Sequence, residues 1–545
     1  QLRTADAFLK MIHEYEDLMI LSSKPYHFAS LLFSESVMVS GRGALLQKIR
    51  TEYVQISNTL AFFSPELLAV DKSKLQKLAK NKALSEYHNY IASLIQYQRH
   101  ELPEREKQIF SDLSLTGSSA LNRMYDEEFA AREYEIKRGK KASFHSLSEA
   151  LDLLHSSDRA TRQAAQAGFS NGLIEDSRRI TLIFNTLLQD KQVRDRYHKF
   201  ENPEDARHLE NQIPMKVVDA LVRATKQSYR DVARFYEFKR DLLGYKKLYD
   251  YDRYAPIGHG RKIPWNDAKN YVIEAFEDFH PEFGRIAKEF FTRRWIDAEA
   301  RPGKRGGAFC SFVTPDLHPY VFMNYGGTER DVFTLAHELG HAIHAYLMRE
   351  QRYLNFDTPL TIAETASVFA ELLLFYSLVD KMRSQEAKLA LRVHHLENLI
   401  ATIHRQVSMF LFERDVHAAR RKGELHTEDF NRIWRARQEE MFRGSVELTP
   451  GYDYWWSYVP HFVHTPFYVY AYSFGQLFAL GLYEKFEHQP EPFAQRYIEF
   501  LRSGNSKSPV ELGHLLGVNL SRPEIWQNGV KTFRKMLLET EKLAG

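Results

Sequence analysis

The chain has only one cysteine, Cys310, among its 545 residues. A single thiol excludes an intrachain disulfide framework and a zinc site built from cysteines. This composition fits a reducing compartment, and we expect a cytoplasmic protein. In its context, A-F-C-S-F, Cys310 is interpreted as a small buried hydrophobic residue and not as a nucleophile.

A strong charge of one sign and long hydrophobic runs are also missing. The 74 basic and 71 acidic residues leave a net charge of +3, which gives no indication of nucleic acid or an anionic membrane as a partner. No run of about 18 or more apolar residues is present, so we expect no membrane span. The hydrophobic content of 44% and the mean hydropathy of −0.45 indicate a soluble globular chain, and its length predicts two or more lobes.

Most of the chain has apolar residues at the three- and four-residue spacing of amphipathic helices, so the expected fold class is mainly α. Ser146 and Glu149 have the spacing of a capping box and suggest a boundary between two helical regions. We therefore predict an N-terminal helical lobe over residues 1–148 and a larger second domain over residues 149–545.

The most informative helix is predicted over residues 328–347, which read TERDVFTLAHELGHAIHAYL. Thr328 and Asp331 have capping-box spacing, and acidic residues in a first turn suit the helix dipole. Apolar residues then recur at helical spacing. Gly340 interrupts this pattern, and a small residue there would let another backbone or a substrate approach closely.

Within this helix, His337 and His341 lie four residues apart on one face, where two imidazoles can bind one zinc ion. Glu338 is the candidate general base of a metallopeptidase. Glu364 on the next predicted helix is the candidate third ligand, and Glu371 a candidate partner that orients a ligand histidine. An ordinary polar helix face is the alternative for the H-E-x-x-H residues, a capping residue for Glu364, and a solvated carboxylate for Glu371.

Residues 301–326 have a different character, with glycines followed by two short β-like runs. They predict a small hairpin or sheet just before the H-E-x-x-H helix. An edge strand can bind an extended peptide through its unpaired backbone groups. We hypothesise that Gly307, Ala308 and Phe309 bind substrate in this way, and a purely structural hairpin is the alternative.

Four segments carry a family resemblance: GKRGGAF (303–309), HPYVFMNY (318–325), FTLAHELGHAIH (333–344) and AETASVFAE (363–371). They resemble oligoendopeptidase F, of the thimet-oligopeptidase-like zinc peptidases, and the resemblance extends over most of the chain from about Leu94 onward. It implies two helical lobes enclosing a deep substrate channel, one Zn²⁺ per chain, and short peptides as substrates.

A second chemical region, rich in aromatic residues and histidine, spans residues 449–475. If one helix runs through it, His464, Tyr468 and Tyr472 lie on one face, with His461 one turn earlier. The resembling family uses His and Tyr residues of this region to stabilise the oxyanion of amide hydrolysis, a role that suits such donors. An aromatic core is the alternative interpretation.

This region departs from the family pattern at residues 465–467, which read Thr-Pro-Phe where thimet oligopeptidase has a Gly-Gly loop. The departure leaves open which tyrosine acts. Elsewhere, His394, His395 and His404 have no ligand partners in the sequence, and we interpret them as scaffold residues.

The sequence therefore predicts a zinc-dependent endopeptidase that hydrolyses internal bonds of short unstructured peptides, with its catalytic domain over residues 149–545. A zinc carboxypeptidase of the helical H-E-x-x-H type is one alternative; it needs a cation for the free carboxylate, and Arg305 is the nearest candidate. A non-catalytic peptide-binding scaffold is the other, against which an intact Glu338 argues. A site with two nitrogens and one oxygen also accepts Co²⁺ or Mn²⁺.

Overall fold

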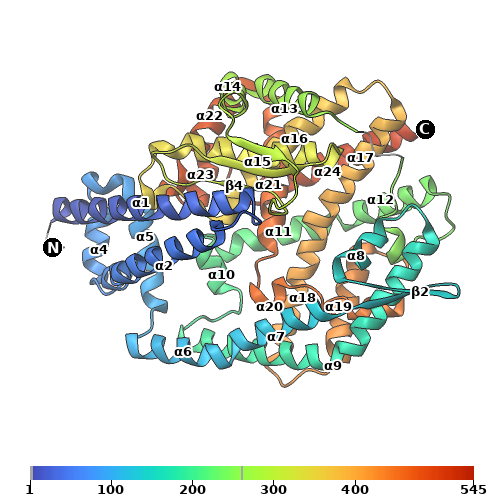
Figure 1. Cartoon of the computed structure of the whole chain (residues 1–545), viewed down its shortest axis with the longest axis horizontal. Coiled ribbons are helices and arrows are strands. Elements are labelled where there is room, and N and C mark those ends of the chain that lie inside the picture. The colour runs from blue at the N-terminus through green and yellow to red at the C-terminus, as the bar shows by residue number, and fades with distance from the viewer. Residues whose placement is uncertain (1–3, 259–261) are drawn as a thin grey trace.

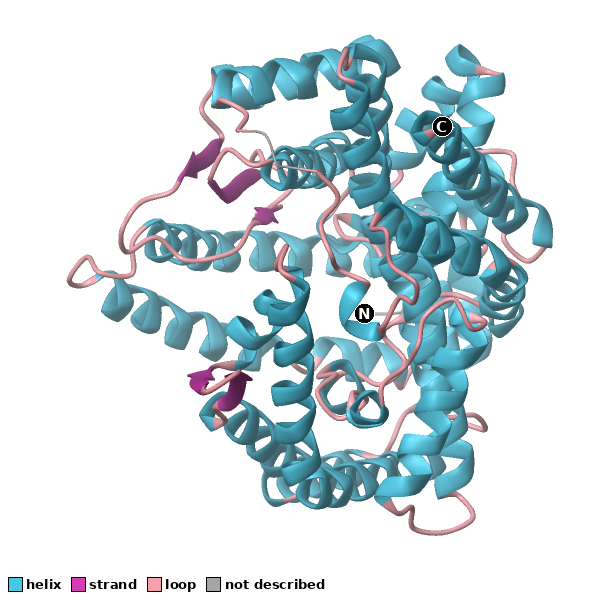
Figure 2. Cartoon of the chain, turned by 90° about the vertical axis from the view of Figure 1, so that its right-hand side faces the viewer, coloured by secondary structure: helices cyan, strands magenta, loops and turns pink. Residues whose placement is uncertain are grey.

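The computed structural model describes residues 4–258 and 262–545, and nearly all of its regular structure is helical (Figures 1 and 2). The strands form two small patches (Figure 2). The expected mainly α fold class, with a small sheet beside the H-E-x-x-H helix, is confirmed.

The N-terminal helices surround a hydrophobic cluster of their own, in which Phe8, Leu75 and Tyr87 are fully buried. Figure 1 shows these helices in blue at one end of the molecule. They are α1 (Ala5–Glu35), α2 (Arg42–Leu60), α3 (Phe63–Leu68), α4 (Lys72–Ala79) and α5 (His88–Tyr97).

The middle of the chain adds the 39-residue helix α9. Asp158 is the N-cap of this helix, and its side chain accepts hydrogen bonds from N–H groups of the first turn. The helices of this part are α6 (Glu104–Thr116), α7 (Ser118–Ala131), α8 (Leu147–Asp152), α9 (Arg159–Tyr197), α10 (Asp205–Glu210), α11 (Met215–Gln227), α12 (Tyr229–Leu242), α13 (Trp265–Phe279) and α14 (Pro281–Thr292).

The remaining helices build the centre of the molecule, where α15 packs on α16, α16 on α21, and α21 on α24. Their apolar residues belong to the large core cluster that extends from Tyr125 to Leu537. These helices are α15 (Glu329–Leu347), α16 (Leu360–Lys381), α17 (Gln385–Leu399), α18 (Arg405–Arg420), α19 (Thr427–Phe442), α20 (His461–His464), α21 (Tyr470–His488), α22 (Pro490–Arg502), α23 (Pro509–Leu515) and α24 (Pro523–Ala544), with a π-helical turn, η7 (Ile400–His404), between α17 and α18.

The strands form a hairpin, β1 (Tyr134–Arg138) with β2 (Lys141–His145), and a three-stranded sheet. The sheet has the order β3 (Ile296–Glu299), β5 (Tyr320–Tyr325), β4 (Phe309–Ser311), in which β5 runs parallel to β3 and antiparallel to β4. Both β4 and β5 contact α15, so the predicted sheet does lie beside the H-E-x-x-H helix. The hairpin of β1 and β2 was not expected from the sequence.

Glu16 of α1 ties the N-terminal helices to the segment between α15 and α16. Its carboxylate is completely buried and accepts hydrogen bonds from the Tyr87 hydroxyl at 2.7 Å, the Leu354 N–H at 2.9 Å and Arg352 Nε at 2.9 Å. A buried carboxylate with three donors stabilises this junction and costs free energy if any donor is removed. The predicted domain boundary at 148/149 stays a prediction.

By length and composition alone, α16 is apolar enough to cross a membrane, with a mean hydropathy of 1.6. However, 72% of that window is buried inside the protein, where α16 packs between α15 and α21. Such burial is typical of the core helix of a globular protein.

Candidate functional site

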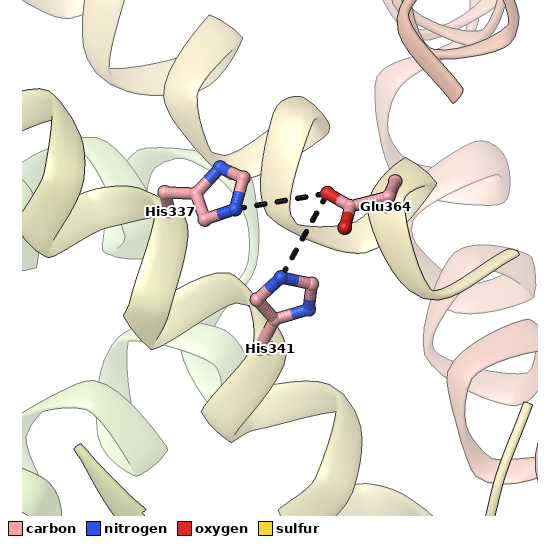
Figure 3. Close-up of side chains that lie close together, drawn as sticks. All are labelled: His337, His341 and Glu364. Carbon is pink, nitrogen blue, oxygen red and sulfur yellow. Dashed lines mark ion pairs between the residues drawn. The ribbon is translucent and has the colours of Figure 1, made fainter. Parts of the chain in front are cut away.

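Three side chains from α15 and α16 converge on one point (Figure 3). Glu364 Oε2 lies 3.7 Å from His337 Nε2 and 3.9 Å from His341 Nε2, and the three ligand atoms lie within 4.8 Å of one another. In the part of the chain that the structure describes, no other group of His, Cys, Asp and Glu side chains has this spacing. Two imidazole nitrogens and one carboxylate oxygen could hold one divalent metal ion.

The helix that carries the two histidines begins as expected. Thr328 and Asp331 form a complete capping box, in which each side chain accepts a hydrogen bond from the other residue's backbone N–H. The box satisfies N–H groups that would otherwise have no partner at the start of the helix. It therefore fixes where α15 begins and which face carries His337 and His341.

Two glycines allow the neighbouring helices to reach the metal group. A Cβ atom on Gly340 would lie 2.7 Å from the Ser367 Cα and 2.9 Å from the Ala366 carbonyl oxygen, so α16 can approach α15 only because Gly340 has no side chain. A Cβ atom on Gly475 of α21 would lie 3.0 Å from the Glu364 Cβ. Glu364 is thus held between α15 and α21 by close backbone packing.

Glu371 orients the first histidine. Its Oε1 lies 2.5 Å from His337 Nδ1, so Nδ1 carries a hydrogen, and in the neutral ring Nε2 would present its lone pair toward Glu364 and His341. Burial lowers the pKa of His337, but the hydrogen bond and charge of Glu371 outweigh it and raise the pKa to about 9. The donor atoms and their tautomer fit a bound metal ion, which would displace a proton from His337.

Glu338 is only 7% exposed and lines a cavity of about 510 Å³ together with His337, Glu364 and Tyr472. Burial raises the pKa of Glu338 to about 7, and the carboxylates of Glu364 and Glu371 add to this rise. A carboxyl group with a pKa near neutrality can both take up and release a proton during one reaction cycle.

The second chemical region does not form the single helix considered from the sequence. The helix stops after His464 and resumes at Tyr470. Between them Phe467 has a φ of 61°, a left-handed backbone conformation that residues other than glycine rarely adopt. His464, Tyr468 and Tyr472 therefore do not share one helical face.

The turn nevertheless brings His461, Tyr468 and Tyr472 together. His461 Nε2 lies 3.3 Å from the Tyr472 hydroxyl, and the ring centroids of Tyr468 and Tyr472 lie 5.2 Å apart. Burial raises the pKa of both tyrosines, so both phenols are protonated donors at neutral pH. Of these three residues, only Tyr472 is among those that line the cavity of Glu338.

His464 points elsewhere. Its Nε2 lies 2.8 Å from Asp126 Oδ1 of α7, and its ring packs edge-on to Tyr125 with centroids 6.0 Å apart. It also lines a different cavity from that of Glu338. These contacts join α20 to α7.

Two polar side chains from distant helices support the left-handed turn. The fully buried carboxylate of Glu413 in α18 accepts a hydrogen bond from the Phe467 N–H at 2.7 Å. Arg207 of α10 donates from Nε to the Pro466 carbonyl at 3.4 Å, and its guanidinium lies 5.6 Å from the centroid of the Tyr468 ring. Neither Glu413 nor Arg207 was predicted from the sequence, because no local spacing links them to the aromatic region.

The strand β4 lies near Glu338, although none of its residues is among those that line the cavity. Burial raises the pKa of the Cys310 thiol in β4, and the nearby charge of Glu338 raises it further. Gly307, which precedes β4, has a φ of 86°, and the side-chain amide of Asn324 donates to the Gly307 carbonyl at 3.1 Å. Since β4 pairs only with β5 in the described sheet, its other edge faces away from β5 and is not paired within that sheet.

Other cavity-lining residues were not predicted as part of the site: Arg330, His394, Asn398 and Gln476. Arg330 lies seven residues before His337, and Gln476 four residues after Tyr472. These spacings place each of them on the same helical face as a predicted site residue, which is a signal the sequence contained. His394 was interpreted as a scaffold residue, but it lines the cavity.

Comparisons with known proteins identify relatives that cover most of the chain. The sequence profile of Peptidase family M3 matches residues 152–532, and that of Oligopeptidase F matches residues 66–134. The chain is 27% identical over 552 residues to oligopeptidase PepF of Bacillus subtilis strain 168, covering 99% of this chain and 81% of that protein. It is 26% identical to an oligoendopeptidase F homologue of Lactococcus lactis subsp. lactis, covering 99% and 91% of the two chains.

Solved structures share the fold. A Chlamydophila abortus protein, only provisionally assigned as a peptidase, superposes with a TM-score of 0.92 at 23% identity, covering 100% of this chain and 92% of that one. Oligoendopeptidase F from Enterococcus faecium superposes with a TM-score of 0.73 at 22% identity, covering 99% and 94%. The chain therefore belongs to peptidase family M3 and is a metalloendopeptidase related to oligoendopeptidase F.

Proposed function

We propose that the protein is a zinc-dependent oligopeptidase that cleaves internal bonds of short unstructured peptides. The observation that carries the proposal is the buried Glu338, which shares one cavity with the His337 and Glu364 side chains and with Tyr472. A proton acceptor, a metal-binding group and an oxyanion donor in one cavity are what hydrolysis of an amide requires.

His337, His341 and Glu364 would hold the metal ion, with Glu371 keeping His337 in the required tautomer. A zinc ion bound there supplies Lewis acidity toward the scissile carbonyl and lowers the pKa of a water toward ~7. Glu338 takes the proton of the attacking water and delivers it to the leaving amine.

The other side of the cavity acts on the carbonyl oxygen as negative charge develops there. The Tyr472 hydroxyl donates a hydrogen bond to this oxygen, and His461 Nε2 donates to Tyr472 in turn, which the 3.3 Å separation supports. Because Tyr472 lines the cavity and Tyr468 packs against it, we propose Tyr472 as the direct donor and Tyr468 as its neighbour.

The substrate backbone would add to β4 as a further strand, with Gly307, Ala308 and Phe309 at the start of the pairing. Strand addition reads the backbone and not the sequence, which suits a peptidase for varied short peptides. The single cysteine agrees with the cytoplasmic location that we propose for it.

The test uses a peptide of about ten residues with both ends blocked, incubated with the zinc-loaded protein and analysed by mass spectrometry. We expect internal cleavage by the parent protein and a loss of at least about 10³-fold in kcat for E338Q, with unchanged zinc content. Glu350 is an exposed glutamate just after α15, so E350Q is the matched control and should keep parental activity. Equal cleavage by E338Q and the parent protein would place the general base elsewhere.

A further inference from the structure

The cavity that contains Glu338 extends well beyond the metal group. Its carboxylates, Glu338, Glu364 and Glu371, lie at the metal end. The lining also includes Arg330 of α15 and His394 and Asn398 of α17. The cavity therefore carries a cation and hydrogen-bond donors besides the acidic metal group, whose charge a bound metal ion would neutralise.

Arg330 lies on the same face of α15 as the metal group. It precedes His337 by seven residues, which corresponds to two helical turns and about 10 Å along the axis. Its side chain is exposed, and its guanidinium makes no ion pair or hydrogen bond with any residue that the structure describes. An arginine that lines the cavity and donates to no described protein group can donate hydrogen bonds to a ligand.

His394 and Asn398 lie four residues apart on one face of α17 and line the same cavity as Arg330. Asn398 Nδ2 lies 3.3 Å from His394 Nε2. Glu397 lies 3.9 Å from His394 Nδ1, but its carboxylate is paired with the buried Lys239. Desolvation lowers the pKa of His394, and the charges of Lys239, His155 and Arg330 lower it further, so the charge of Arg330 reaches His394.

We propose that Arg330, assisted by His394 and Asn398, forms a subsite for a carboxylate of the substrate about three residues away from the scissile bond. The proposal rests on the proposed function, because it places the peptide in the same cavity. An extended chain advances about 3.3 Å per residue, so three residues span the roughly 10 Å between His337 and Arg330. The guanidinium offers a planar pair of N–H donors that matches a carboxylate.

Two kinds of peptide carry a carboxylate at this position: one that ends there, and one with an Asp or Glu side chain there. The first would make the enzyme release short C-terminal fragments, and the second would select acidic sequences. Arg305, the cation that the sequence suggested for a free carboxylate, is not among the residues that line this cavity. Its backbone N–H instead donates to Ser34 of α1 at 3.0 Å.

The test measures peptide binding to zinc-loaded E338Q by calorimetry, so that it does not depend on turnover. One peptide pair differs only in a free or amidated C-terminus three residues beyond the scissile bond, and a second, longer pair has Glu or Gln at that position. We expect the carboxylate member of at least one pair to bind about 10- to 100-fold more tightly. The pair that shows the difference identifies which kind of carboxylate is recognised.

The preference should fall below about threefold in E338Q/R330Q, and E338Q/R330K should retain part of it, because Lys keeps the charge but not the planar donors. E338Q/R178Q is the matched control, since Arg178 of α9 is exposed and lies outside the cavity. Equal binding of both members in both pairs overturns the subsite, and so does a preference that survives R330Q. Failure of the proposed function is distinguishable, because it would appear as no cleavage by the parent protein while the binding preference remains.

Discussion

The two sides of the cavity are built in different ways. The candidate metal side consists of two continuous helices, α16 and α15; α15 begins with a complete capping box and carries His337 and His341 at helical spacing. The side that we propose to stabilise the oxyanion, the oxyanion side, is a broken helix in which a left-handed residue, Phe467, separates His461 from Tyr472. The arrangement of the metal side follows local helical periodicity, whereas that of the oxyanion side depends on residues far away in the sequence.

The supports of the two sides differ accordingly. On the metal side, Gly340 and Gly475 remove side chains so that helices meet closely around Glu364. On the oxyanion side, Glu413 and Arg207 add polar side chains that bind the backbone of the turn. Close packing tolerates no added volume, while these hydrogen-bonded supports tolerate no loss of a partner. Substitutions on the two sides separate these two sensitivities.

Replacing Tyr472 with Phe should lower kcat by about 10²–10³-fold, because one proposed oxyanion donor is lost. KM and metal content should change little, since the hydrogen bond of Tyr472 among the described residues is to His461 and not to a candidate metal ligand. Steady-state kinetics and metal analysis measure both. Y468F is the matched variant and should cost less; a larger loss in Y468F would reverse the assignment of the direct donor.

Replacing Gly340 with Ala should destabilise the protein by about 1–3 kcal/mol and weaken metal binding, because the new Cβ meets the backbone of α16. Thermal unfolding with and without added zinc reports both effects. The control is G43A in α2, where a new Cβ would meet only a Phe33 ring atom at 3.5 Å. If G340A behaves like G43A, close approach of α16 does not depend on this glycine.

Replacing Glu413 with Ala should lower kcat about tenfold and stability by about 1–3 kcal/mol, because the buried Phe467 N–H loses its acceptor. Metal content should be unchanged. E413Q keeps both the volume and an acceptor oxygen and should recover most of the activity, whereas E413L keeps most of the volume without an acceptor and should not. Parental kcat in E413A would show that the turn holds its shape without this side chain.

Lowering the pH should lower the free energy of unfolding, because two buried histidines are neutral in the folded protein. Burial lowers the pKa values of His404 in η7 and His417 in α18 to about 3, and the His417 ring lies 4.8 Å from that of Phe467. In the unfolded chain each histidine takes up a proton below its ordinary pKa of about 6.5. Folded stability is therefore lost as pH falls from about 6.5 toward 3, by about 2 kcal/mol per histidine at pH 5.

Urea unfolding of the parent protein and H417Q at pH 7.5 and pH 5 tests this linkage. The decrease in the free energy of unfolding between the two pH values should be about 2 kcal/mol smaller in H417Q. Taking the difference between the two proteins removes the contribution of other groups, including Glu413, whose pKa burial raises to about 8. An identical decrease in both proteins contradicts a buried neutral His417.

Much of the metal side could be predicted from the sequence. The capping box at Thr328, the helical face of His337 and His341, and the β-like runs before them are short-range patterns, and the structure contains each of these elements. The sequence also suggested that Gly340 admits a close neighbour, and the neighbour is the α16 backbone. What it did not indicate is Gly475, whose role exists only where α21 crosses α16.

The oxyanion side could be predicted only in part. Residues 461–472 stood out by composition, but helical spacing through them was wrong, because Phe467 adopts a left-handed conformation. That conformation costs local free energy, and it persists here alongside the buried hydrogen bond to Glu413, 54 residues earlier in the chain. No pattern within residues 461–472 reports such a partner.

The sequence by itself determined the helices, their capped start and the spacing of the candidate metal ligands, because these depend on interactions between residues a few positions apart. Only the tertiary structure decided which tyrosine lines the cavity, that His464 contacts Asp126, and that Arg330 and His394 line the same cavity. These arrangements depend on how separate helices pack, and packing is fixed by contacts between residues that are distant in sequence.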